Sequence, residues 1–242
     1  MKKKSLLLIS ILNLKKSKYK WIGIIILLFG LLYGGSYVYE ELTRLPPKEA
    51  VKIGTENTIR ANNYRFRVVS SRVLEGEEVV LSDVYGDRCS RGIHLKGTLP
   101  LIQADVEIYH IGENIYRKDS CSENWVKVPA RGRVAIEQLI AELNPLESFN
   151  FLDNKFEAKY VGKEKVDGRK CYKYEVMTRG ENKYLELFWR SFNYIIWIDK
   201  NDNLIRKASV IAEHLDNSQH CLNIVVSITD YEELIEIKAP IE

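Results

Sequence analysis

The chain has 242 residues, 45% of them hydrophobic, and a net charge of +3. This length fits one domain with an anchor, or at most two small domains. Seven lysines between Lys2 and Lys20 exceed the net charge, so the rest of the chain is slightly acidic. That balance excludes the basic face that a nucleic-acid-binding domain needs.

An uncharged run from Trp21 to Tyr39 predicts a transmembrane helix, because nineteen helical residues at ~1.5 Å each span about 28 Å. The preceding lysines should stay in the cytoplasm, which places the C-terminal bulk outside. The alternative is a cleaved signal peptide, which has a shorter apolar core and a small-residue cleavage site. We therefore expect a single-pass cell-membrane protein. Its predicted parts are a basic cytoplasmic segment (1–20), a transmembrane helix (21–39), a linker (40–47) and an extracytoplasmic domain (48–242).

The periodicity after the membrane span changes from helical to strand-like. Pro46 and Pro47 end the first helix, and Pro47 can begin a second one over about 48–61. From Tyr64 onward, apolar and polar residues alternate, which indicates half-buried strands. The segments with this pattern or an apolar strand core include 64–68, 93–99, 106–108, 156–161, 172–176, 194–198, 204–210 and 222–229.

Turns and inserted helices define the fold class. Val166-Asp167-Gly168-Arg169 is a strong hairpin signal, and helical spacing predicts helices over 134–143, 146–152 and 182–192. About nine strands joined by short turns favour antiparallel pairing over a βαβ parallel sheet. The sequence therefore predicts an α+β domain in which a strongly curved antiparallel sheet carries helices on one side.

Four cysteines, Cys89, Cys121, Cys171 and Cys221, all follow the predicted span. An even number outside a membrane predicts disulfides, with three pairings open. Pairing of neighbours in sequence gives Cys89–Cys121 and Cys171–Cys221, and the latter pair requires the sheet to curl or a strand to return beside an earlier one. Four free thiols are the alternative. No closely spaced ligand pairs are present, so we expect no metal site.

Several short motifs follow one another over about 48–242. In chain order they are Ile115-Tyr116, Trp125-Val126-Lys127-Val128, Asn144-Pro145-Leu146-Glu147, the 166–172 hairpin, Ile196-Trp197-Ile198-Asp199, Asp230-Tyr231 and Ala239-Pro240. In the order of these motifs, the chain resembles the LolA/LppX-like lipoprotein carrier family. The resemblance implies an unclosed half-barrel whose concave face is covered by helices and holds lipids or acylated peptides. The helical anchor departs from relatives that are soluble or lipid-anchored, which argues against long-distance shuttling.

Large aromatic residues alternate along the predicted strands and provide the candidate ligand-binding residues. An apolar wall suits an acyl chain because ligand pockets are mostly apolar, whereas the plain alternative is an ordinary core. No catalytic motif such as GxSxG, HExxH or a phosphate-binding glycine loop is present, so we expect no enzyme and no cofactor. The candidate cavity-wall residues are Tyr64, Phe66, Tyr172, Tyr174, Phe188, Tyr194 and Trp197.

Two functions follow from this pattern. The first is a membrane-anchored, extracytoplasmic, non-enzymatic binding protein for a hydrophobic ligand, either a lipid or an acylated molecule. The second is an envelope sensor or regulatory protein that binds another membrane or envelope protein, because a related half-barrel acts as a negative regulator of an envelope stress response. A protein partner without a bound lipid would favour the second function.

Overall fold

The computed structural model describes residues 41–74, 76–119, 122–129, 131, 156–178 and 188–241. Within the described residues of the unit Pro46–Glu242, an α-helix and a short 3₁₀ helix accompany an eleven-stranded antiparallel sheet. The elements are α2 (Pro47–Arg60), β1 (Tyr64–Leu74), β2 (Glu77–Cys89), β3 (Gly92–Leu99), the 3₁₀ helix η1 (Pro100–Ile102), β4 (Ala104–Ile111), β5 (Asn114–Lys118), β6 (Trp125–Lys127), β7 (Phe156–Val166), β8 (Arg169–Thr178), β9 (Trp189–Asp199), β10 (Ile205–His214) and β11 (Cys221–Thr229).

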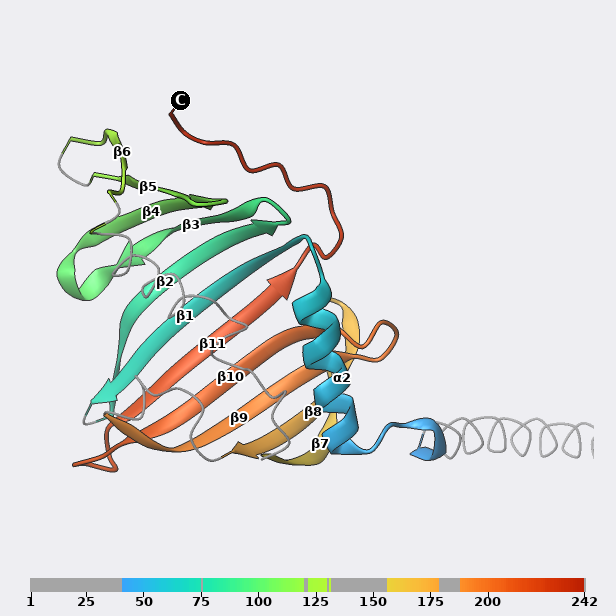
Figure 1. Cartoon of the computed structure of the whole chain (residues 1–242). Coiled ribbons are helices and arrows are strands. Elements are labelled where there is room, and N and C mark those ends of the chain that lie inside the picture. Colours follow the sequence, from blue (N-terminus) through green and yellow to red (C-terminus); the bar gives the residue numbers. More distant parts are fainter. Residues whose placement is uncertain are drawn as a thin grey trace, which may run out of the picture. The chain divides into compact units, whose positions relative to one another are not determined.

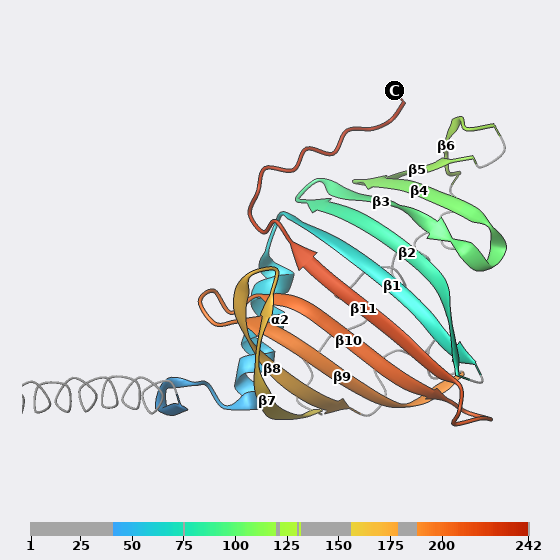
Figure 2. The same cartoon turned by 180° about the vertical axis from the view of Figure 1, so that it is seen from behind.

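The sheet consists of two meanders that join at its centre. Strands β1 to β6 follow one another to one edge, and β11 back to β7 follow one another to the other. The two meanders meet where β1 pairs antiparallel with β11, from Arg65 opposite Thr229 to Val73 opposite Cys221. The edge strands β6 and β7 do not pair with each other, so the curved sheet is unclosed (Figures 1 and 2).

Helix α2 defines the two faces of the sheet. It packs against β7, β9 and β10 (Figure 1). Its Gly54 lies so close to Ile198 that an added Cβ would come within 2.8 Å of the Ile198 Cδ1 atom. The buried Thr58 hydroxyl accepts a hydrogen bond from the Ile205 backbone N–H at 3.0 Å, which fixes the helix to the start of β10. We call the face that carries Ile198 the inner face, and the opposite face the outer face.

Several predicted elements are confirmed. The helix expected at 48–61 is α2, and Pro47 is its first residue. The 166–169 hairpin joins β7 to β8 through Asp167 (φ 48°) and Gly168 (φ 79°), the two positive φ angles of a type I′ turn. The antiparallel, unclosed sheet is also confirmed.

Other predicted elements differ from the structure. There are eleven strands rather than about nine, and β2 was not predicted. The helix predicted over 182–192 is wrong for 189–192, which begin β9; there Trp189 and Arg190 pair with β10. The helices predicted over 134–143 and 146–152, and residues 182–187 of the third, lie outside the described residues.

The predicted disulfides are wrong, because Cys89, Cys171 and Cys221 are free thiols. The register explains the second pair. Cys171 lies opposite Asp199, at one end of β9, whereas Cys221 lies opposite Glu213, at the far end of β10. The strands β8 and β11 that carry these cysteines are about 14 Å apart across the sheet, but a disulfide requires Cα atoms within about 7 Å. Cys121 lies outside the described residues.

In the part of the chain that the structure describes, no helix has the length and apolar character to cross a membrane. The predicted span, 21–39, lies outside that part.

Candidate ligand-binding face

An uncharged row of side chains crosses the inner face from β4 to β7. The pairing register places its members opposite one another on nine successive strands, so the row extends for about 38 Å at ~4.8 Å per strand. The six central strands contribute buried residues, none more than 5% exposed. In sheet order the row is Val106, Gly97, Val84, Val68, Val226, Ala208, Ile196, Tyr174 and Tyr160.

A second uncharged row runs beside the first on the same face. It begins with a pair of serines, whose hydroxyl groups lie 2.5 Å apart between β1 and β2. The remaining members are apolar or tyrosine. In sheet order the row is Ser82, Ser70, Ile224, Val210, Tyr194, Val176 and Ala158. Together the two rows form the inner wall, which is much wider than the part that α2 packs against.

Most of the predicted aromatic residues lie on this wall or continue it. Tyr64, Phe66, Tyr174 and Tyr194 are buried, and Tyr172 is opposite Ile198 on the same face. Phe66 lies across Gly86 of β2, where an added Cβ would come within 2.0 Å of the ring. Glycine is therefore required at position 86 for the Phe66 ring to lie flat along the wall.

Two predicted wall residues lie elsewhere. Trp197 is on the outer face, because it alternates with the inner residues Ile196 and Ile198 along β9. There it packs with Val166 and Cys171 in a small buried cluster. Phe188 precedes β9, and its side chain is 60% exposed. Periodicity does not reveal the outward position of Trp197, because the 194–198 run is apolar on both faces.

The Trp197 cluster is held by charged neighbours. The indole N–H donates a hydrogen bond to Glu164 Oε2 at 2.9 Å, and this bond is the largest cause of a lowered pKa of Glu164. Lys173 and Lys207 each place an ammonium group 4.9 Å from the Trp197 ring. These contacts account for Trp197 structurally and separate it from the inner wall.

Tyr64 brings a polar atom to the edge of the wall. Its hydroxyl oxygen is buried, and burial raises the pKa of Tyr64 to about 12, an increase that the nearby Arg88 partly offsets. Its ring packs at 5.8 Å from Tyr231, whose hydroxyl donates to the Ile205 carbonyl. Both phenols are therefore neutral at physiological pH, so the wall carries no charge from them.

A hollow of about 870 Å³ lies on the outer side of β2 to β4 and differs in chemistry from the inner wall. Its lining includes five carboxylates and two lysines: Asp83, Asp105, Glu107, Asp119, Glu123, Lys96 and Lys118. An acyl chain has no affinity for such a lining. The described residues contain no cluster of three or more His, Cys, Asp or Glu side chains that could hold a metal ion.

Comparison with solved structures finds proteins of similar architecture. The lipoprotein LppX from Mycobacterium tuberculosis superimposes with a TM-score of 0.53 over 79% of this chain and 97% of its own, at 14% identity. The chain has the LppX-like fold. LprF from Mycobacterium bovis shares it, with a TM-score of 0.51 over 80% of this chain and 96% of LprF, at 10% identity. No family model matches the sequence, and no curated protein matches it by sequence.

Proposed function

We propose that this protein is a membrane-anchored, extracytoplasmic binding protein for a lipid or another acylated molecule, and that it is not an enzyme. The observation that carries the proposal is the inner wall: two uncharged rows that cross an unclosed sheet. Apolar lining with few polar groups is the chemistry of sites that bind hydrophobic ligands. The LppX-like fold and the lipoprotein-carrier resemblance of the sequence support the same reading.

The wall is wider than the packing of one helix requires, and this width favours a bound ligand over a surface that only packs against α2. Helix α2 packs mainly against β7, β9 and β10, yet buried inner-face residues continue to Ile115 on β5. Polar atoms on the wall are few, and the paired hydroxyl groups of Ser70 and Ser82 satisfy each other. A long hydrocarbon chain would therefore meet apolar side chains along the whole wall.

A matched pair of substitutions on β10 tests this proposal. Ala208 is 2% exposed in the middle of the wall, whereas Ser209 is the next residue and faces outward. In Ala208→Phe the ring fills space that a ligand would use, and we expect the full-length chain in mild detergent to bind a fluorescent fatty acid about tenfold more weakly, which is ~1.4 kcal/mol. Ser209→Phe should bind like the wild type.

Overpacking itself costs about 1–3 kcal/mol, so circular dichroism and a thermal melt must first show that both variants are folded. Saturable binding that is lost only in Ala208→Phe supports the inner wall as the site. If the folded wild type has no affinity for the probe, or if both variants bind equally well, the proposal is wrong.

A further inference from the structure

The two ends of the sheet differ in the residues that they expose. One end contains the turns β2–β3, β4–β5, β7–β8 and β9–β10, and none of their residues is a large hydrophobic group that is exposed. The other end contains the β1–β2 turn, the β10–β11 loop, the end of β8 and the start of β9. We call this second end the rim end.

Exposed apolar side chains gather at the rim end. The Leu215 backbone N–H donates to the Phe188 carbonyl at 3.0 Å, so these two residues are neighbours across the β9 and β10 tips, and their side chains are 42% and 60% exposed. Met177 and Ile211 both lie opposite Asn193, and each is more than half exposed. We call these residues, together with Val79 and Val80 of β2, the apolar rim.

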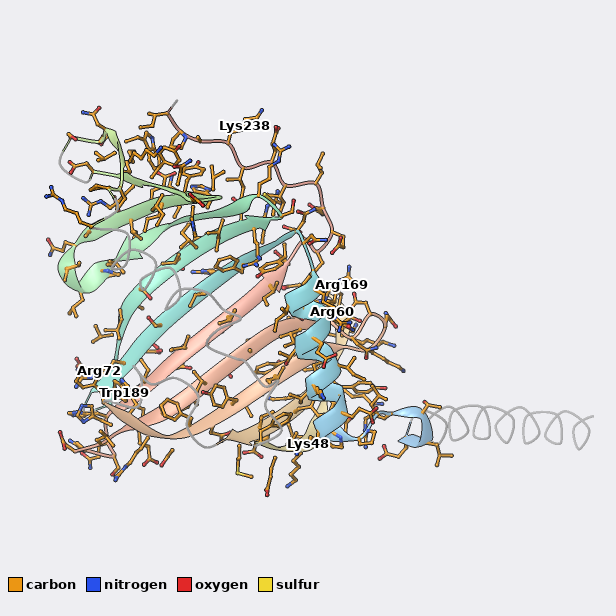
Figure 3. All side chains as sticks on the ribbon, in the orientation of Figure 1. Lys48, Arg60, Arg72, Arg169, Trp189 and Lys238 are labelled. Atoms are coloured by element: carbon orange, nitrogen blue, oxygen red, sulfur yellow. The ribbon has the colours of Figure 1, made fainter. Side chains whose placement is uncertain are left out.

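An aromatic and a cationic side chain lie at the same end of the sheet as the apolar rim. The Arg72 guanidinium is 5.8 Å from the Trp189 ring centre, and the two lie together at this end of the sheet (Figure 3). Trp189 also meets His214 edge to face at 5.2 Å. Tryptophan and arginine beside apolar groups are typical of the interface between water and lipid, where both amphipathic groups are favourable.

The chain enters the domain at the same end. Lys48, in the first turn of α2, lies 5.5 Å from the Phe156 ring, and Phe156 is opposite Thr178, the residue after Met177. The predicted membrane span ends at Tyr39, and the seven residues 40–46 separate it from Pro47. Seven residues extend no more than about 25 Å, so the proposed anchor would tether the rim end close to the bilayer.

We propose that the apolar rim docks on the surface of the lipid bilayer, so that the end of the sheet nearest the anchor contacts the membrane. This inference rests on the anchor in the proposed function. Exposed apolar groups that lose water in the interfacial region stabilise such contact, and the tether removes most of the entropic cost of docking. The opposite end, whose four turns expose no large hydrophobic residue, remains in water.

Photocrosslinking of the full chain tests the docking. The photoreactive residue benzoylphenylalanine is placed at Phe188, at Leu215 or, as a control, at Leu234, which is 94% exposed and follows β11 at the turn end. Each protein is reconstituted in vesicles of phosphatidylethanolamine and phosphatidylglycerol, illuminated and analysed by mass spectrometry. We expect several-fold more phospholipid adduct at Phe188 and Leu215 than at Leu234.

Equal yields at all three positions, or crosslinks at the rim to protein instead of lipid, would overturn the docking. Fatty-acid binding is measured on the same preparations to separate the two claims. Probe binding without rim adducts rejects the docking and leaves the proposed function standing, whereas rim adducts without probe binding reject the ligand and retain the docking.

Discussion

At the scale of single residues, the described cysteines are free thiols instead of the expected disulfides, and their environments differ. Cys171 is 1% exposed beside Trp197 and Val166, and burial, assisted by the nearby Asp199 carboxylate, raises the pKa of its thiol to about 11. Cys221 is only partly buried, at the start of β11 near the β10–β11 loop. A thiolate is the reactive form of cysteine, so these two thiols should differ strongly in reactivity.

Alkylation of the native protein measures this difference. At pH 8 iodoacetamide should modify Cys221 many times faster than Cys171, because the Cys171 thiol is both inaccessible and protonated at that pH. The rates are compared by peptide mapping, with urea-unfolded protein as the control in which the two rates converge. Equal rates in the folded state, or a disulfide-linked peptide that contains Cys171 and Cys221, would contradict the structure.

Alternation along a strand predicts which residues share a face, but it does not say which face is inner. The sequence places Tyr172 with Tyr174, and Cys171 with Lys173, and the register confirms both groupings. The prediction from alternation fails at Trp197, because the outer face of β8 and β9 carries its own buried cluster. An apolar residue there does not mark the inner wall. Phe188 was misplaced because the element that follows it is a strand rather than a helix.

At the scale of elements, the β9–β10 hairpin is stabilised by a buried ion network. Asp199 is fully buried, with its carboxylate 3.3 Å from both Arg206 Nε and Arg169 Nη1, and Arg206 is 5% exposed. Asp202 pairs with Arg206 as well, and the Asn201 N–H donates to Asp199 at 2.9 Å. The network stabilises the β9–β10 turn. Helix α2 is fixed beside the same turn, because Thr58 accepts the hydrogen bond from Ile205 at the start of β10.

Removal of one partner should therefore be costly. Asp199→Ala leaves the buried Arg206 with only Asp202, and we expect the free energy of unfolding to fall by about 3 kcal/mol. Glu236→Ala, which removes an exposed partner of Lys238, should cost less than ~1 kcal/mol. Urea unfolding of the two variants gives both values, and similar small losses would show that the network contributes little.

Strand β2 shows why some elements were not visible in the sequence. Its residues include Asp83, Gly86 and Asp87, which are poor strand formers by themselves. The two aspartates pair with arginines of the neighbouring strand β1: Arg67 Nη2 lies 2.6 Å from Asp83, and Arg65 Nε lies 3.2 Å from Asp87. These cross-strand ion pairs are tertiary contacts. A reading of one segment at a time cannot detect them.

At the scale of the whole molecule, the order of motifs predicted the architecture better than any single motif did. Two runs of short strands separated by a helical region led to two meanders, and the first and last strands, β1 and β11, meet at the centre of the sheet. That junction could not be predicted from spacing, because the contacts between Phe66 and Ile228 join residues far apart in the chain. It is also the junction that makes the inner wall continuous.

This continuous wall is the proposed site of the hydrophobic ligand. The most direct measurement is native mass spectrometry of the full chain, extracted from its own membrane in mild detergent and washed free of loosely associated lipid. We expect one lipid or acylated molecule to remain bound to each chain and to be released when urea unfolds the sheet. A fully folded protein that carries no such molecule, or that carries a stoichiometric protein partner in its place, would contradict it.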